Sequence, residues 1–316
     1  MRLFPLLAIC LFLPLPLFSG TLSAVGPLPY DDRHPSPRPG CTHRFDGQVA
    51  KGDLDAFKAL PTDPQVVVCL DSPGGSFLEG IAIGEYIRQV GIGTRLEAGT
   101  TCESACSIIF MSGTYIADEV EFGNPDDESW QLGHHPWRTM HPTARLGLHA
   151  PRLEVTKGQY DEANVTRAYD VALQTLAEFS RRLMSSGPSY AVYFDPDLFS
   201  AMIATPHGSM FYIDTVKRAI RFKVEVGPVR SPVSPDEAAL KYACANFYGW
   251  NEFRTQEAYE AEIAGAHVDG TKVTLAGGLN CTFEKGGKET IWQYHIYDFA
   301  DLNFYAHDMP LSDLAP

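Results

Sequence analysis

Basic side chains are scarce in this sequence of 316 residues, which holds 25 Lys and Arg against 39 Asp and Glu. The formal net charge at pH 7 is -14, so the protein repels phosphate groups at long range. This excludes nucleic acid and anionic lipid as non-specific partners. The apolar share of 45% and the charged share of 20% are typical of a globular protein and exclude wholesale disorder.

Long apolar runs are also rare. The one such run follows Arg2 at the N-terminus and leads into small residues that end at Ala24, an order typical of a secretory signal peptide. The run contains prolines and is short for a membrane span, so we expect residues 1–24 to be cleaved rather than retained as an anchor. We therefore expect an exported protein, either periplasmic or secreted.

The rest of the chain divides into three parts. Residues 25–40 are rich in proline and have no apolar period, which predicts an extended linker. Residues 41–230 carry strand and helix patterns in regular order and form the main predicted domain, in which the polar segment 117–144 is expected to be an insertion. Residues 231–316 hold helical patterns followed by strand patterns, which predicts a small α+β module.

The main domain has the pattern of an α/β fold. The valine-rich segment 65–71 lacks polar alternation, which is typical of a parallel strand covered on both faces. A glycine turn and an amphipathic helix at 77–90 follow it, in the order of a βαβ unit. The order recurs with a strand at 93–98, a short apolar helix at 104–111 and a strand at 144–149.

Two of these turns carry residues suited to acyl transfer. Gly74 and Gly75 follow a strand directly, where backbone N–H groups can approach a ligand closely and hold an oxyanion. Ser104 begins the short apolar helix among small residues, as an accessible nucleophile must, and His149 ends a later strand as the candidate base. Each residue alone is as typical of a structural role, but together they predict a Ser/His site.

These residues resemble the Clp protease proteolytic subunit and its relatives in the crotonase superfamily. Here the sequence DSPGGS at 71–76 ends a strand, and Ser104 lies 29 residues beyond Gly75, the spacing of that family. The interval from Ser104 to His149 is longer than in the family by about the size of the insertion. The resemblance covers residues 41–225 and implies a crotonase-like, Clp protease-like spiral of ββα units.

The resemblance also implies a role for each residue. It makes Ser104 the nucleophile and His149 the general base. It makes the N–H groups of Gly75 and Ala105 the oxyanion hole, with Gly74 shaping the turn.

The third member of a triad is open. The family pattern places an aspartate in the segment that holds Asp195 and Asp197, whereas alignment on the later sequence FYIDTVKRAI points to Thr205 or His207. A threonine or a water that orients His149 would leave a slower catalyst, and the lack of any partner would indicate a pseudoenzyme.

A long helical pattern at 157–186 matches the handle region through which this family assembles, so we expect a homo-oligomer. Lys157 lies at its start, and signal-peptide peptidase A relatives use a Ser/Lys dyad. A solvated lysine at the start of a surface helix is the simpler interpretation.

Six cysteines remain after the signal peptide, and an even number in an exported chain permits disulfides. The three candidate pairs are Cys41 with Cys69, Cys102 with Cys106, and Cys244 with Cys281. The second pair brackets Ser104 one helical turn apart, within disulfide reach, and is interpreted as a clip that stiffens the turn or as two buried thiols. The third pair lies within the C-terminal module. The first lies on predicted neighbouring strands and could be paired or free.

We expect no cofactor and no metal. The insertion holds a combination that could bind zinc, namely His134, His135 and His141 with Asp126, Asp127 and Glu128. Its spacing fits no closed four-ligand site, and the segment is more typical of a solvated lid or a subunit contact.

The predicted function is an exported Clp-like serine hydrolase, a peptidase that acts on short peptides or unfolded protein through an acyl-enzyme on Ser104. ATP is scarce outside the cytoplasm, so we expect no ATPase partner. The alternative is a non-catalytic Clp-like protein that holds a peptide or a scaffold partner. Acyl-CoA chemistry is a third possibility, which export disfavours because CoA is intracellular.

Overall fold

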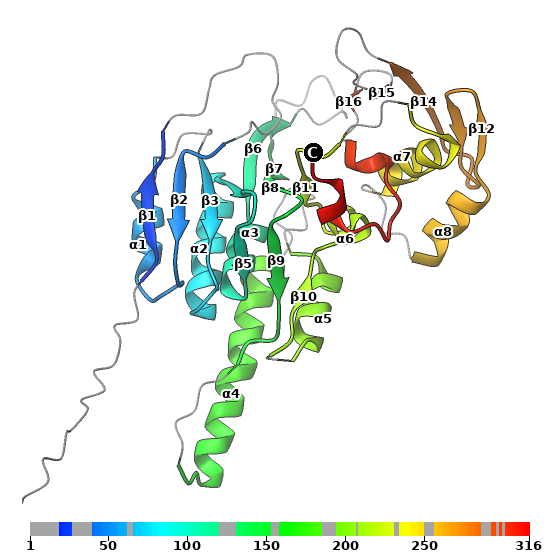
Figure 1. Ribbon diagram of the computed structural model, residues 1–316. Coiled ribbons are helices and arrows are strands. Elements are labelled where there is room, and N and C mark those ends of the chain that lie inside the picture. The colour runs from blue at the N-terminus through cyan, green and yellow to red at the C-terminus, as the bar shows by residue number, and fades with distance from the viewer. Residues whose placement is uncertain are drawn as a thin grey trace, which may run out of the picture.

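The computed structural model describes residues 19–26, 40–61, 66–119, 131–152, 158–184, 194–206, 208–230, 234–249, 256–285, 292–294, 297–298 and 301–316. The described chain is a mixed α/β protein. Helices lie behind its largest sheet, and the C-terminal helices and strands form a smaller group beside it (Figure 1).

A six-stranded sheet forms the centre of the first domain. Its strands lie in the order β1 (Thr21–Ala24), β2 (His43–Asp46), β3 (Val67–Asp71), β4 (Gly93–Leu96), β8 (Arg138–Met140) and β11 (Glu225–Val226). Neighbouring strands are parallel, except that β1 runs antiparallel to β2. The first four residues of β3 are buried, which confirms the strand predicted from its unbroken apolar pattern.

Helices bury one face of this sheet. They are α1 (Asp53–Lys58), α2 (Phe77–Val90), α3 (Ala105–Met111) and α6 (Val216–Arg221). Their apolar residues share one core with inward-facing strand residues such as Phe45, Leu70 and Met140. All seven residues of α3 are buried, so this short helix has a position fixed on every side.

A second, smaller sheet contains β5 (Thr101–Glu103), β9 (Arg145–Leu148) and β10 (Phe211–Tyr212). Residues 72–75, which directly continue β3, lie beside β5 through a bridge between Ser72 and Cys102. Three times the chain therefore runs from the large sheet into the small one and then to a helix. These passes are β3, 72–75 and α2; β4, β5 and α3; β8, β9 and α4 (Glu162–Phe179). The carboxyl ends of the short parallel strands meet at one edge.

The segment 117–144, expected to be an insertion, contributes to the main sheet. β6 (Thr114–Glu119) and β7 (Gln131–Pro136) form an antiparallel hairpin, but β8 is a central strand between β4 and β11. All three residues of β8 are buried. Its sequence, Arg-Thr-Met, concealed the strand because a buried arginine is rare.

The helix α4 projects from the body of the molecule (Figure 1). It is shorter than the predicted helix at 157–186, and a π-helix at Ser180–Met184 continues it. Within α4 only Phe179 is buried. The exposed apolar side chains of α4 and the residues before it are Tyr160, Val165, Tyr169, Val171 and Leu173.

The C-terminal part, which we call the C-terminal module, holds two helices followed by strands in the described residues. It contains α7 (Glu237–Gly249), α8 (Gln256–Ala264), β12 (His267–Asp269), β13 (Lys272–Thr274), β14 (Asn280–Lys285), β15 (Trp292–Tyr294) and β16 (Tyr297–Asp298). The strands pair in chain order in an antiparallel sheet. A separate core, which includes the disulfide of Cys244 with Cys281, lies between this sheet and α7.

The end of the chain returns to the first domain. The turns η2 (Asp301–Phe304) and η3 (Leu311–Leu314) follow the module. Leu302, Leu311 and Leu314 join the main core rather than that of the module. The N–H of Lys217, in α6, donates to the carbonyl of His307 at 2.9 Å. Residues 301–314 therefore link the C-terminal module to α6 and the main core.

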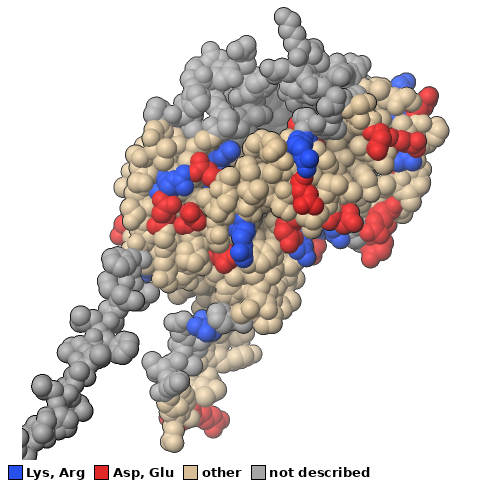
Figure 2. All heavy atoms as spheres, viewed as in Figure 1, with Lys and Arg blue, Asp and Glu red and all other residues tan. Residues whose placement is uncertain are grey.

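Charges of both signs lie over the first domain on the face drawn in Figure 2, and acidic side chains gather over the C-terminal module. Arg44 forms an ion pair with Glu97, and Arg145 forms one with Glu103. Within the described ranges, no helix combines the length and apolar character needed to cross a bilayer.

The edge strand β1 falls within the predicted signal peptide. It pairs along its length with β2, and Gly20 packs against the ring of Phe45. Of its four residues only Leu22 is partly buried. Cleavage near Ala24 would remove this strand, together with the contacts that Gly20 makes with Phe45 and Leu22 makes with the main core.

His307 predicts how stability responds to pH. Its Nε2 lies 2.8 Å from Oδ1 of Asn246. Burial, with a smaller contribution from Lys217, lowers its pKa to about 4, although Glu260 and Asp308 act in the opposite direction. The folded state therefore favours neutral His307. Its contribution to the free energy of unfolding is complete above pH 6.5 and is lost as the pH falls toward about 4.

We expect His307→Gln to reduce the loss of stability between pH 7 and pH 5, because glutamine does not titrate. Urea unfolding of wild type and variant at both pH values measures this difference. His267 is exposed, so His267→Gln should keep the wild-type pH dependence. Equal pH dependence in wild type and His307→Gln would contradict the assignment.

Candidate active site

Ser104 lies at the turn between β5 and α3. Its φ of 55° and ψ of −122° belong to a region that glycine populates almost alone, and Lys223 is the other described non-glycine residue with positive φ. Such a conformation costs about 1–3 kcal/mol and persists only where surrounding contacts enforce it. The N–H of Ser104 donates to the carbonyl of Gly147 at 2.9 Å, and Ser107 Oγ donates to the Ser104 carbonyl at 2.6 Å.

The chain segments that begin at Ser72, Cys102 and Leu146 lie side by side, because these three residues pair with one another across parallel strands. Ser72 pairs with Cys102, and Cys102 pairs with Leu146. Three residues further along these chains are Gly75, Ala105 and His149. A Cβ on Gly74 would lie 2.7 Å from Cβ of Ser104 and 3.0 Å from the N of Ala105, and the N–H of Ser104 donates to the carbonyl of Gly147, two residues before His149.

Gly74 and Gly75 have surroundings that accept only glycine. A Cβ on Gly74 would lie 2.7 Å from Cβ of Ser104 and 2.4 Å from the carbonyl oxygen of Glu103. A Cβ on Gly75 would lie 2.1 Å from the carbonyl oxygen of Val49. Both glycines also have positive φ, of 90° and 146°. The Gly-Gly turn therefore packs directly against the serine turn.

The N–H groups of Gly75 and Ala105 suit a negatively charged oxygen. The carbonyl of Gly74 and the N–H of Ser76 both bond to Val49, so the intervening Gly75 N–H points away from Val49, to the side on which β5 lies. Ala105 is the first residue of α3, and an N–H there has no acceptor within its helix. Both donors could serve an oxyanion beside the serine.

His149 follows the last residue of β9. Its Nδ1 lies 2.8 Å from the carbonyl oxygen of Ala150. A carbonyl can only accept, so this contact favours a proton on Nδ1 and leaves Nε2 as an acceptor, the tautomer that a general base needs. The N–H of Ala150 donates to the carbonyl of Thr205 at 2.9 Å, which holds the orienting carbonyl in place.

The structure separates the candidates for a third member. Asp195 is the N-cap of α5 (Pro196–Ala204), and Asp197, in its first turn, pairs with Arg221. Thr205 is the C-cap of the same helix and adjoins the segment after His149. A helix of nine residues is about 13 Å long, so the two aspartates lie at the end of α5 away from that segment. Of the described candidates, Thr205 is the one that contacts the segment after His149.

A polar cluster of Glu103, Arg145 and Tyr212 lies directly before the site. The Tyr212 hydroxyl donates to Glu103 Oε1 at 2.9 Å, and Arg145 bonds to both partners. Gly147 separates Glu103 from Tyr212 in the sheet, and a Cβ there would lie 2.9 Å from the Tyr212 ring. The cluster ties β5, β9 and β10 together. Sequence reasoning missed it because its members are far apart along the chain.

Arg138 is a second residue that sequence reasoning missed. Its buried guanidinium donates to the carbonyls of Met111 and Phe222, at the C-terminal ends of α3 and α6. Burial lowers its pKa to about 10, and Asp195 opposes this shift. The group remains charged at pH 7, and a cation stabilises the C-terminal end of a helix. The helix that begins after Ser104 is therefore held at both ends.

The three predicted cysteine pairs form disulfides. They join Cys41 to Cys69, Cys102 to Cys106, and Cys244 to Cys281, with Cα–Cα distances of 5.6, 5.2 and 5.7 Å. The second encloses Ser104. Three disulfides indicate an oxidising environment.

The metal-binding alternative finds no support in the described residues. Their one group of potential ligands is Cys41, Cys69 and Glu97, and its cysteines form a disulfide. His141 contacts Thr143, with Nδ1 2.8 Å from Oγ1. The predicted residues that lie outside the described ranges are Asp126, Asp127, Glu128, Lys157 and His207.

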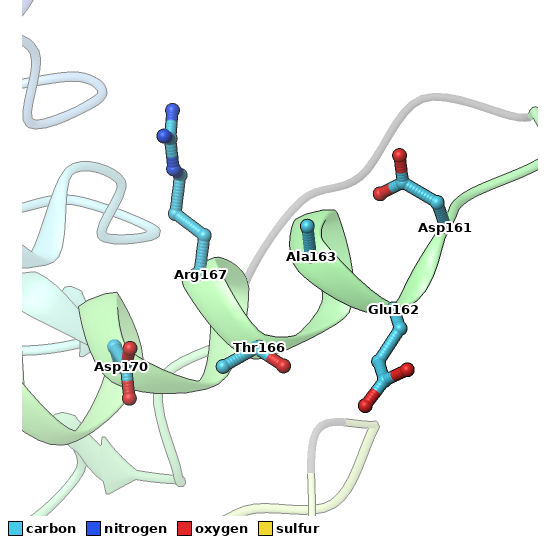
Figure 3. Close-up of a pocket in the computed structure, with 6 residues that line it drawn as sticks. All are labelled: Asp161, Glu162, Ala163, Thr166, Arg167 and Asp170. Carbon is cyan, nitrogen blue, oxygen red and sulfur yellow. The ribbon is translucent and has the colours of Figure 1, made fainter.

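An open hollow of about 650 Å³ runs along the start of α4. Asp161, Glu162, Ala163, Thr166, Arg167 and Asp170 line it. Figure 3 shows that these side chains come from a single helical segment and point in different directions. We assign no function to a hollow bounded by one helix.

No family model and no curated protein matches the sequence. Any assignment of function therefore depends on the geometry of the site.

The Gly-Gly turn yields a prediction about stability. We expect Gly74→Ala to lower the free energy of unfolding by about 2–4 kcal/mol, because alanine adds both an unfavourable φ and a clash with the serine turn. Gly99 has a φ of 72° and open space around it, so Gly99→Ala should cost only about 1–2 kcal/mol. Urea unfolding compares them. A Gly74→Ala variant as stable as Gly99→Ala would show that the turns are not tightly packed.

The position of Asp195 yields a second prediction. As the N-cap of α5 it accepts from the N–H groups of Asp197 and Leu198. Asp195→Ala should lower the free energy of unfolding by about 1 kcal/mol, whereas Asp195→Asn, which keeps a capping oxygen, should stay within about 0.5 kcal/mol of wild type. Thermal unfolding measures both. Equal losses for alanine and asparagine would refute the capping role.

Proposed function

We propose that the protein is an exported serine hydrolase, a peptidase that cleaves amide bonds through an acyl-enzyme on Ser104. The observation that carries the proposal is the pairing of Ser72 with Cys102 and of Cys102 with Leu146, from which we infer that Gly75, Ala105 and His149 lie beside the serine turn. A nucleophile, a base and two amide donors are the parts of an acyl-transfer site. The backbone conformation of Ser104 supports it, because residues held in such regions cluster at active sites.

In the proposed mechanism Ser104 Oγ attacks the substrate carbonyl carbon while Nε2 of His149 takes the hydroxyl proton. The oxygen of the tetrahedral intermediate accepts hydrogen bonds from the N–H groups of Gly75 and Ala105. His149 then gives the proton to the leaving amine. Water attacks the acyl-enzyme by the same route, which releases the carboxylic acid and restores the serine.

In this mechanism the carbonyl of Ala150 orients the base by accepting a hydrogen bond from Nδ1 of His149. A neutral carbonyl fixes the tautomer, but it stabilises the imidazolium less than a negative charge does. We propose short peptides or unfolded protein as substrates.

The fold that we propose is the crotonase-like, Clp protease-like spiral of ββα units. Its support is the repeated passage from the large sheet to the small one and then to a helix, for β3, β4 and β8 in turn. The C-terminal module lies outside this repeat.

We further propose a signal peptide at residues 1–24, a periplasmic or secreted location, a homo-oligomer and no ATPase partner. The disulfides support export. The exposed apolar side chains of α4 support assembly, because such a face on a projecting helix is otherwise unfavourable in water.

The same face of α4 favours a second candidate function. A non-catalytic Clp-like protein would use exposed apolar side chains, such as Tyr169 and Leu173, to hold a peptide or a scaffold partner. It would not acylate its serine.

A fluorophosphonate probe tests the proposal, because it labels only an activated serine. We expect the wild type to be labelled, Ser104→Ala to be unlabelled, and His149→Gln to react about 10²–10⁴-fold more slowly. Ser200 is an exposed hydroxyl on α5, so Ser200→Ala should be labelled like the wild type. Equal labelling of Ser104→Ala would discard the nucleophile, and no labelling of the wild type would favour the second candidate.

A further inference from the structure

The disulfide of Cys102 with Cys106 forms a closed ring of backbone around Ser104. Cys102 lies in β5 and Cys106 in the first turn of α3, and neither has any exposed surface. The link therefore joins the strand before the serine to the helix after it. It lies on the core side of the turn, where it cannot contact a substrate directly.

This disulfide is poorly placed for general stabilisation. Its cysteines are 4 residues apart, whereas those of the other two disulfides are 28 and 37 apart. In the loop-entropy model, a cross-link stabilises the fold more as the loop it closes grows longer. The short loop indicates that the contribution of Cys102–Cys106 is local.

The local feature within that loop is the backbone of Ser104. A serine at φ 55° and ψ −122° relaxes toward ordinary regions unless its neighbours prevent it. On one side Gly74 packs against its Cβ. On the other, the disulfide fixes the separation of residues 102 and 106, which limits the backbone conformations open to the three residues between them.

We propose that the Cys102–Cys106 disulfide is a positioning element of the serine turn, so that the turn is fully ordered only in the oxidised protein. The effect of the disulfide on the reactivity of Ser104 rests on the proposed function, whereas its effect on the order of the turn does not. Oxidation removes two electrons and two protons from the two thiols and passes them to a disulfide oxidant of the export compartment, which becomes a dithiol. A chain still in a reducing compartment would lack an ordered nucleophile.

The first test compares two disulfide deletions by their rate of fluorophosphonate labelling. Cys102→Ala/Cys106→Ala should be labelled at least fivefold more slowly than wild type, with a cooperative thermal transition retained. The matched control, Cys244→Ala/Cys281→Ala, removes a disulfide of the C-terminal module and should change the rate less than twofold. A loss smaller than fivefold in the first variant, or an equal loss in both, would overturn the proposal.

The second test needs no activity. The N–H groups of Ser104 and Ser107 donate to the carbonyls of Gly147 and Ser104, so their hydrogen exchange reports the order of the turn. We expect exchange at both amides to be at least tenfold faster in Cys102→Ala/Cys106→Ala. Adding Ser104→Gly should restore protection at Ser107 by at least threefold, because glycine adopts positive φ without cost.

Unchanged exchange in the double variant, or no restoration by Ser104→Gly, would overturn the proposal. If the wild type is not labelled at all, the proposed function fails. The exchange experiment then still decides whether the disulfide orders the turn.

Discussion

The lateral pairing of three short strand ends is the constraint on which the rest of the structure depends. Residues 72–75, β5 and β9 pair in parallel, so their carboxyl ends meet at one edge. Strands this short make few hydrogen bonds, and their pairing is stable only if the elements on either side hold them. β3 and β4 lead into them from the large sheet, and the buried α3 leaves β5 on the other side.

Several contacts reinforce this pairing from different directions. The side chains of Glu103, Arg145 and Tyr212 form hydrogen bonds that join the three strands of the small sheet, next to the start of the Ser104 turn. Arg138 holds the far end of α3 by donating to the carbonyl of Met111. The turn of Ser104 is thus over-determined, which is the condition under which an unfavourable backbone conformation survives.

Local patterns in the sequence predicted most of the fold and part of the site. The valine run of β3, the Gly-Gly turn and the short apolar α3 are signals within single segments, and each was found. β5 and β8 were missed because strands of three residues with polar sequences have no period to detect. The Glu103 cluster depends on pairing between distant segments, which no local pattern reveals.

The third triad member could not be predicted for a different reason. Sequence reasoning considered the side chains of Asp195, Asp197, Thr205 and His207, whereas the structure shows a backbone carbonyl, which every residue carries, at Nδ1 of His149. What distinguishes Ala150 is its position, held by the bond of its N–H to Thr205. A main-chain partner cannot be recognised from the residue type, because every residue has a carbonyl group.

The proposed site therefore consists largely of backbone. In the proposed mechanism two amides would bind the oxyanion and a carbonyl would orient His149, so only Ser104 and His149 need particular functional groups, while Gly74 and Gly75 need only the absence of a Cβ. Such a site requires particular residue types at few positions, but it requires the backbone to be placed accurately at many. The reactivity of such a site would depend on the contacts that hold its backbone in place. The Cys102–Cys106 disulfide around Ser104 is the covalent one among these contacts.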